Sequence, residues 1–164
     1  MRFFLKILGG GMLVVLAVSL SKGYKRFLEN RLKEYEGLLS LISHFDMKVR
    51  NYLSFGSAMW RDFSNEIMEK CGVLPLLRDG ETLSSALEKC KNKLTLPTEI
   101  KEKLLSKISA LGQGYLNDEK EMLSEIKDMI SKNLKKETEE IEKNVKVADA
   151  LLFGCAAVII IMSH

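Results

Sequence analysis

Both ends of this 164-residue chain are apolar runs without charge, and these runs constrain the fold more than any other feature. Ile7–Ser21 has no charged residue over 15 positions, and Ala150–Ser163 has none over 14. A helix that crosses a membrane needs about 20 apolar residues, with about 17 as a lower limit. The first run reaches that length if Lys6 extends its ammonium group to the interface, and the second only if residues from Val145 onwards contribute. The two runs predict a transmembrane helix at each end.

Two other interpretations of these runs stay open. A 14-residue apolar run also suits a buried core helix. The N-terminal run follows Arg2 and contains Ala17-Val18-Ser19, so it also has the form of a signal peptide with a cleavage site. The alternative function is then an exported helical binding module that a C-terminal segment anchors. We prefer two spans because the same feature occurs at each terminus and nowhere between.

Charge is distributed unevenly along the chain. Residues 1–60 carry 9 Lys/Arg and 4 Asp/Glu, whereas the remainder carries 16 and 18. Because Lys and Arg beside membrane spans stay in the cytoplasm, we expect a cytoplasmic domain over residues 23–148, flanked by transmembrane segments 1–22 and 149–164. This charge balance is too weak to indicate nucleic-acid binding. The basic residues after the first run, here called the basic collar, are candidates for contact with lipid or a partner: Lys22, Lys25, Arg26, Arg31 and Lys33.

The middle of the chain has the three- and four-residue spacing of amphipathic helices. This spacing predicts helices over residues 24–53, 58–71, 81–91 and 97–111. Ser57 is the expected N-cap of the second helix and Gly72 its stop. Pro75 and Asp79-Gly80 predict loops or turns between the second and third helices.

The last part of the chain contains no helix breaker. Apolar residues from Leu116 to Ala148 form one helical stripe, which predicts a helix of 47 residues if it continues to Met162. Such a helix is about 70 Å long and would run from the soluble region into the membrane. No segment alternates with the period of two that strands require. The expected fold is therefore all-α, an antiparallel helical bundle flanked by N- and C-terminal transmembrane helices.

Residues that carry enzyme chemistry do not form a motif in this sequence. His44, Cys71 and Cys90 fit structural positions within helices, and the cysteines form no CxxC pair. No phosphate-binding loop, dinucleotide fingerprint or nucleophile elbow is present. We therefore expect no catalytic residue, cofactor, metal or small-molecule substrate, and a function that resides in surfaces.

The order of these elements resembles the stage III sporulation protein AB family over essentially the whole chain. The resemblance depends on four short motifs whose order and spacing match. They are Leu5-Lys6-Ile7-Leu8-Gly9, Phe55-Gly56-Ser57-Ala58, Leu111-Gly112 and Leu152-Phe153-Gly154.

Several positions depart from the family pattern. The break at Phe55–Ala58 has no proline, and Lys48 stands where an acidic residue is expected. After Leu-Gly, Tyr115 and Glu119 replace the expected Asp and Gln, and Ala150 replaces a glycine. The chain is similar to a divergent member.

The resemblance implies a role that periodicity does not show. The family's soluble region is similar to the cytoplasmic domain of the type II secretion inner-membrane platform protein. Members belong to a channel complex between mother cell and forespore, together with a cytoplasmic ATPase and membrane-anchored ring proteins. The implied function is a non-enzymatic membrane platform or adaptor that docks the ATPase.

A second candidate partner surface, here called the glycine break, spans residues 111–119 with Leu111, Gly112, Tyr115 and Glu119. A stator-like stalk, suggested by the long final helix, is a third interpretation.

Overall fold

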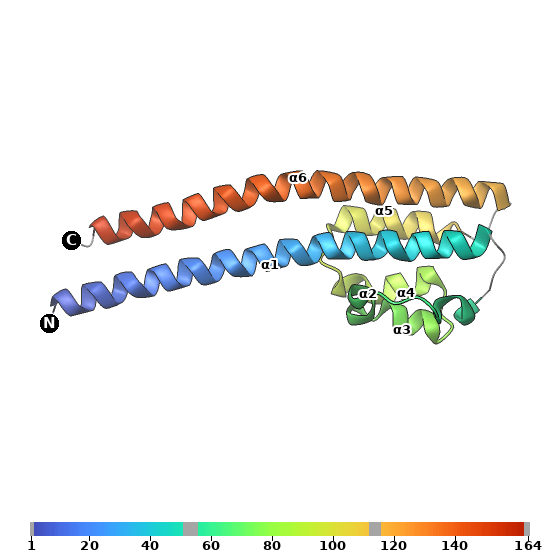
Figure 1. The fold of residues 1–164 in the computed structure, drawn as a ribbon, viewed down its shortest axis with the longest axis horizontal. Helices are drawn as coiled ribbons and strands as arrows, with labels where there is room; N and C mark the ends of the chain where they lie inside the picture. The colour runs from blue at the N-terminus through green and yellow to red at the C-terminus, as the bar shows by residue number, and fades with distance from the viewer. Residues whose placement is uncertain (1, 51–55, 112–115, 163–164) are drawn as a thin grey trace. The chain divides into compact units, whose positions relative to one another are not determined.

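The computed structural model describes residues 2–50, 56–111 and 116–162 (Figure 1). The described residues are helical apart from short connections and contain no strand, so the prediction of an all-α fold is confirmed. They divide into two compact units. The arm pair comprises residues 1–29 and 137–164, and the helical domain comprises residues 30–136. These units describe packing, and the segment boundaries at residues 22 and 148 stay a prediction.

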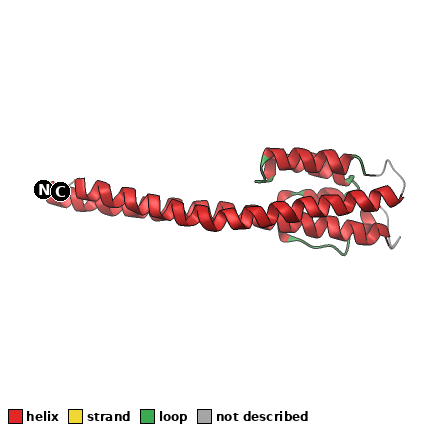
Figure 2. Ribbon diagram, turned by 90° about the horizontal axis from the view of Figure 1, so that it is seen from above, coloured by secondary structure: helices red, strands yellow, loops and turns green. Residues whose placement is uncertain are grey.

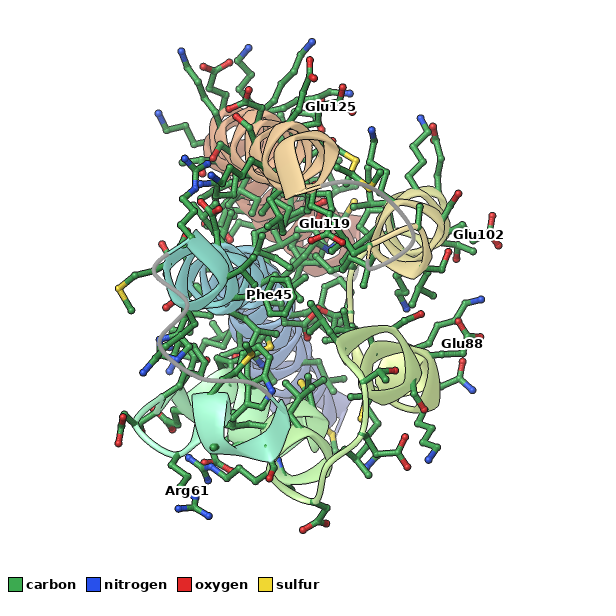
Figure 3. The ribbon with its side chains drawn as sticks, turned by 90° about the vertical axis from the view of Figure 1, so that its right-hand side faces the viewer. Phe45, Arg61, Glu88, Glu102, Glu119 and Glu125 are labelled. Carbon is green, nitrogen blue, oxygen red and sulfur yellow. The ribbon has the colours of Figure 1, made fainter. Side chains whose placement is uncertain are left out.

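The first helix, α1, is continuous from Arg2 to Arg50. The basic collar is part of this helix, so the N-terminal apolar run continues without a turn into the predicted helix over residues 24–53. No proline lies in the first 50 residues, so nothing interrupts the backbone hydrogen bonds. Within the helical domain, α1 lies between α6 (Leu116–Met162) and the short helices α2–α4 (Figures 1 and 3).

The helical domain has one apolar core to which each of its α-helices contributes. Its largest fully buried side chains come from the apolar stripe of α1, from α2–α4 and from the first half of α6. They are Tyr35, Leu38, Leu41, Ile42, Met68, Val73, Leu74, Leu77, Leu87, Leu123, Ile126 and Ile130. Cys71 and Cys90 are buried in the same core, as expected for structural cysteines.

The second helix is shorter than the spacing predicted. Residues 56–60 form a 3₁₀ helix, η1 (Gly56–Trp60), and α2 begins only at Glu66 (Glu66–Cys71) with Asn65 as its N-cap in place of Ser57. Other helices use the carbonyl groups that a continuous helix would need. His44 Nε2 lies 2.8 Å from the Met59 carbonyl oxygen, and Arg78 Nη2 donates to the Phe63 carbonyl at 2.8 Å. Tertiary contacts therefore replace the intrahelical bonds of this segment.

Gly72 ends α2 as predicted, in the left-handed conformation with φ +84°. The prediction of a loop at Pro75 was wrong, because α3 (Val73–Arg78) begins directly after Gly72. Pro75 is the third residue of α3, and the first-turn amide groups of a helix lack intrahelical partners, so proline is tolerated there. The predicted turn at Asp79-Gly80 is confirmed, with Gly80 at φ +96°.

The next two helices agree with the sequence prediction. Thr82 caps α4 (Leu83–Cys90), and a 3₁₀ turn, η2 (Lys91–Lys93), follows. Pro97 is the N-cap residue of α5 (Thr98–Ser109). Between η2 and α5, the Glu34 carboxylate of α1 accepts hydrogen bonds from the backbone amides of Thr95 at 2.7 Å and Leu96 at 3.2 Å. A buried carboxylate thus fixes the connection that leads into α5.

The final helix, α6, spans 47 residues as predicted. Its stripe residues Leu123, Ile126 and Ile130 are buried in the helical domain. The α1 and α6 arms lie side by side and run in opposite directions (Figures 1 and 2).

Candidate functional site

Asp149 of α6 makes polar contacts with α1 in the arm pair. Ser21 Oγ of α1 donates to Asp149 Oδ1 of α6 at 2.5 Å, and Lys25 Nζ lies 2.8 Å from Asp149 Oδ2. Ser21 is buried, and so is Ala17 one turn earlier. Small residues at this position let the two helices approach closely. The contact fixes the register of the arms.

The basic collar is divided between the two units. Lys22, Lys25 and Arg26 belong to the arm pair, whereas Arg31 and Lys33 belong to the helical domain. Lys22, Arg26 and Lys33 are exposed, and Lys25 is paired with Asp149. The collar as a lipid- or partner-facing surface stays a prediction.

A cavity of about 510 Å³ opens at one end of the helical domain, and we call it the end cavity. Its lining is mainly apolar and comes from α1, η1, α4, α5 and α6, together with the turn before α4. The lining residues are Phe45, Val49, Gly56, Met59, Trp60, Gly80, Glu81, Thr82, Leu83, Ser84, Ile108, Ser109, Leu111, Glu119 and Leu123. Figure 3 shows this end of the domain, with Phe45 and Glu119 near its centre.

The end cavity brings together two residues that the sequence singled out in the glycine break. Leu111 and Glu119 both line it. Gly112 and Tyr115 lie outside the described residues. The rest of the lining was not predicted from the sequence. Phe45, Trp60 and Ile108 have the spacing of apolar core residues, and this spacing does not distinguish a residue that lines a cavity from one that is packed in the core.

The polar side of the cavity carries acidic residues and hydroxyl groups. Glu81 is paired with Lys89 and also accepts a hydrogen bond from Ser85 Oγ at 2.6 Å, and these contacts lower the pKa of its carboxyl group. Thr82 uses its hydroxyl to cap α4 by accepting from the Ser85 amide at 3.2 Å. These contacts hold the α3–α4 turn at the cavity mouth.

A buried ion-pair cluster joins α1 and α6 within the helical domain. Asp46 is 5% exposed and accepts from Arg50 Nε at 2.6 Å and from Lys127 Nζ at 2.7 Å. Burial acts to raise the pKa of Asp46, but the hydrogen bonds and positive charges of Arg50 and Lys127 outweigh it and lower that pKa. Asp46 therefore stays ionised and links the two long helices.

The Asp46 cluster predicts a loss of stability in acid. Asp46→Asn is expected to lower the free energy of unfolding by about 2 kcal/mol at pH 7, because it weakens two charge-assisted hydrogen bonds. The folded-state pKa lies below the ordinary value of 3.8. The stabilisation is thus present above that value and is lost as the pH falls through the lowered pKa. Urea unfolding of the full chain, followed by Trp60 fluorescence at pH 7 and in steps below pH 4, measures the difference.

Asp62→Asn is the control, because it also removes an acidic group with a basic partner, but an exposed one. Asp62 Oδ2 lies 3.6 Å from Lys48 Nζ. Asp62→Asn is expected to change stability by less than about 0.5 kcal/mol. A deficit of Asp46→Asn that stays constant down to the lowest pH would contradict the cluster's role.

His44 has a structural environment. Its ring lies between Met59, whose carbonyl oxygen it contacts, and the aromatic rings of Trp60 and Phe63, with centroids 5.9 and 4.9 Å away. Within the described ranges, no group of three or more His, Cys, Asp or Glu side chains is placed to hold a metal ion.

These features define a class of protein: a small all-helical domain whose first and last helices continue into a pair of apolar arms. More particularly, the chain belongs to the stage III sporulation protein AB family, whose model matches residues 6–163. The family resemblance is thereby confirmed, and membership supports a role in sporulation. No curated protein and no solved structure matched the chain.

The predicted transmembrane helices are not confirmed. In the part of the chain that the structure describes, none of the helices carries an apolar stretch of the length that membrane crossing requires.

Proposed function

We propose that this sporulation protein is a non-enzymatic membrane platform, which holds its helical domain in the cytoplasm by inserting the arm pair into the bilayer. The resemblance supports the finer role: a component of the channel complex between mother cell and forespore, which docks a cytoplasmic ATPase. Co-purification of the full chain with the cognate ATPase tests that contact.

The observation that supports the proposal is the distribution of side chains over the arm pair, with small residues between the two helices and large apolar residues on the outside. The side chains buried between the arms include the small residues Ala17 and Ser21. Large apolar side chains point outward and are between 40% and 72% exposed. They are Met12, Val15, Leu16, Leu20, Tyr24, Phe27, Val147, Leu151, Phe153, Val158 and Ile161. Large exposed apolar surfaces mark contact with a membrane or a protein. Lipid suits this one, because helices in lipid pack through small residues and expose large ones.

The same packing supports an intact arm over a cleaved signal peptide. Cleavage after Ser19 would remove most of the α1 arm, including Ala17, which is buried in the arm pair. The exported binding module therefore has less support than the platform.

Thiol labelling tests the topology, and it requires a cysteine introduced on the surface of the helical domain. Native Cys71 and Cys90 are buried, and desolvation raises the pKa of Cys71, so neither is a useful target. Ser40 is exposed on α1. In a Cys155→Ser background, Ser40→Cys is expected to react with a membrane-impermeant maleimide only after spheroplasts of a bacterial host are permeabilised.

Ser163→Cys in the same background is the matched control, and it is expected to react in intact spheroplasts. Reaction of Ser40→Cys in intact spheroplasts would reject a cytoplasmic helical domain.

A further inference from the structure

We propose that basic side chains from both helices of the arm pair bind the headgroups of anionic phospholipids. This inference rests on the proposed function and deepens it, because it names the class of lipid that the arm pair recognises. The residues come from α1 and α6 and are here called the arm band: Lys22, Lys25, Arg26, Lys143 and Lys146.

The Ser21–Asp149 hydrogen bond brings the two parts of the arm band to the same level. Because the arms are antiparallel, the residues that follow Ser21 on α1 lie beside those that precede Asp149 on α6 (Figures 1 and 2). The five cations lie between one and six residues from these two positions, which is within about 9 Å along the helices at about 1.5 Å per residue. On each arm they border the apolar run, so an inserted arm pair holds them at the headgroup layer. Their long stems let the charged groups reach the lipid phosphates.

The arm band has positive charge that its own acidic residue does not neutralise. Residues 20–27 and 143–150 contain five Lys or Arg and one acid, Asp149, so their net charge is +4. The Asp149 carboxylate is already occupied, because Ser21 Oγ donates to one oxygen and Lys25 Nζ lies 2.8 Å from the other. The remaining four cations are exposed. Each Lys or Arg near an anionic membrane surface strengthens the association by about fivefold.

The surroundings of the arm band favour lipid over an acidic protein segment. Towards the chain ends the next residues include Leu20 and Leu151, which are large, apolar and exposed. In the other direction acidic residues follow, among them the exposed Glu29 and Glu139. Tyr24 lies within the band and is exposed, and tyrosine is enriched at membrane interfaces. This order matches the layers of a bilayer, which are hydrocarbon, phosphate and water, whereas an acidic protein segment would match only the charge.

The experiment uses the full chain in bilayers of zwitterionic phosphatidylcholine with a trace of spin-labelled lipid. The probe is phosphatidylglycerol or phosphatidylcholine with a nitroxide near the end of one acyl chain. Its electron spin resonance spectrum separates lipid held at the protein from free lipid. The association constant of phosphatidylglycerol is expected to exceed that of phosphatidylcholine at least twofold at low salt. This selectivity is expected to decrease in about 1 M salt, where charges are screened beyond about 3 Å.

Two sets of substitutions locate the binding. The first neutralises the exposed cations of the arm band, keeps the Lys25–Asp149 pair and is expected to abolish the selectivity: Lys22→Gln, Arg26→Gln, Lys143→Gln and Lys146→Gln. The control removes the same number of lysines and arginines from exposed positions of the helical domain: Arg61→Gln, Lys103→Gln, Lys132→Gln and Lys135→Gln. The control variant is expected to keep the wild-type selectivity. Circular dichroism confirms that both variants are folded.

The proposal is overturned if the wild type holds the two labelled lipids equally, or if the control variant loses selectivity as the arm-band variant does. Binding of a Glu-rich peptide that depends on the arm band, without selectivity for phosphatidylglycerol, would overturn the assignment to lipid and indicate an acidic protein segment. Flotation and carbonate extraction of the same vesicles measure insertion. A chain that inserts but shows no selectivity refutes this inference and leaves the proposed function standing, whereas a chain that does not insert refutes both.

Discussion

Glu34→Ala is expected to lower the free energy of unfolding by about 3 kcal/mol. The Glu34 side chain is 4% exposed, and its carboxylate is the acceptor for the backbone amides of Thr95 and Leu96. Alanine would leave two amides, one of them in the nearly fully buried Leu96, without this acceptor, and each unsatisfied buried group costs about 1–3 kcal/mol. Urea unfolding of the full chain, followed by Trp60 fluorescence, measures the loss.

Glu34→Gln separates hydrogen bonding from charge. The glutamine oxygen can still accept from the two amides, so its loss of stability is expected to be smaller. Desolvation raises the pKa of Glu34 above the ordinary value of 4.5, and the hydrogen bonds from Thr95 and Leu96 offset this only in part. The folded chain therefore holds this proton to higher pH than the unfolded chain, and stability falls as the pH rises from about 4.5 through the raised pKa. The Gln variant should lack this decline. An Ala variant within about 0.5 kcal/mol of wild type would contradict the role of Glu34.

The sequence predicts the long helices well because their signals are local and repeated. The α6 stripe continues without proline or glycine from Leu116 to Ala148, and its 47-residue helix was predicted in full. The segment from Gly56 to Asn65 could not be predicted, because its shape depends on His44 and Arg78, which contact its carbonyl groups from other helices. A proline such as Pro75 ordinarily indicates a loop. Pro75 lies in the first turn of α3 because that helix begins directly after the turn at Gly72.

The candidate site was predictable at one edge only. Leu111 was singled out by the Leu-Gly motif of the family resemblance, and Glu119 by the position at which that pattern expects Gln. Both line the end cavity. The cavity forms where apolar side chains of different helices do not fill the space between them. The spacing of apolar residues along the sequence does not predict such a place. Glu34 and Asp46 did leave a signal, since each is an acidic residue within the apolar stripe of α1. Their partners, Thr95, Leu96 and Lys127, are 61 to 81 residues away and could not be read from spacing.

The Ser21–Asp149 contact gives a common reference point on the two arms. Met12 precedes Ser21 by nine residues and Val158 follows Asp149 by nine, so both lie about 13 Å along the arms from this contact at 1.5 Å per residue. If the polar contact lies at the membrane boundary, as the proposed function implies, both side chains are close to the middle of a hydrocarbon core about 30 Å thick. Both are also among the exposed apolar residues of the arms.

The double variant Met12→Arg with Val158→Arg is therefore expected to move the chain from the membrane to the soluble fraction. An arginine near the middle of a membrane helix costs about 3 kcal/mol, so two cost about 6 kcal/mol. This corresponds to about four orders of magnitude in partitioning. Carbonate extraction of host membranes measures the distribution. Asn30→Arg with Asn144→Arg adds the same two charges at exposed polar positions of the same helices and is expected to stay in the membrane fraction. Retention of the Met12/Val158 variant, or a wild-type chain that is already soluble, would show that the arms meet another protein surface and not lipid.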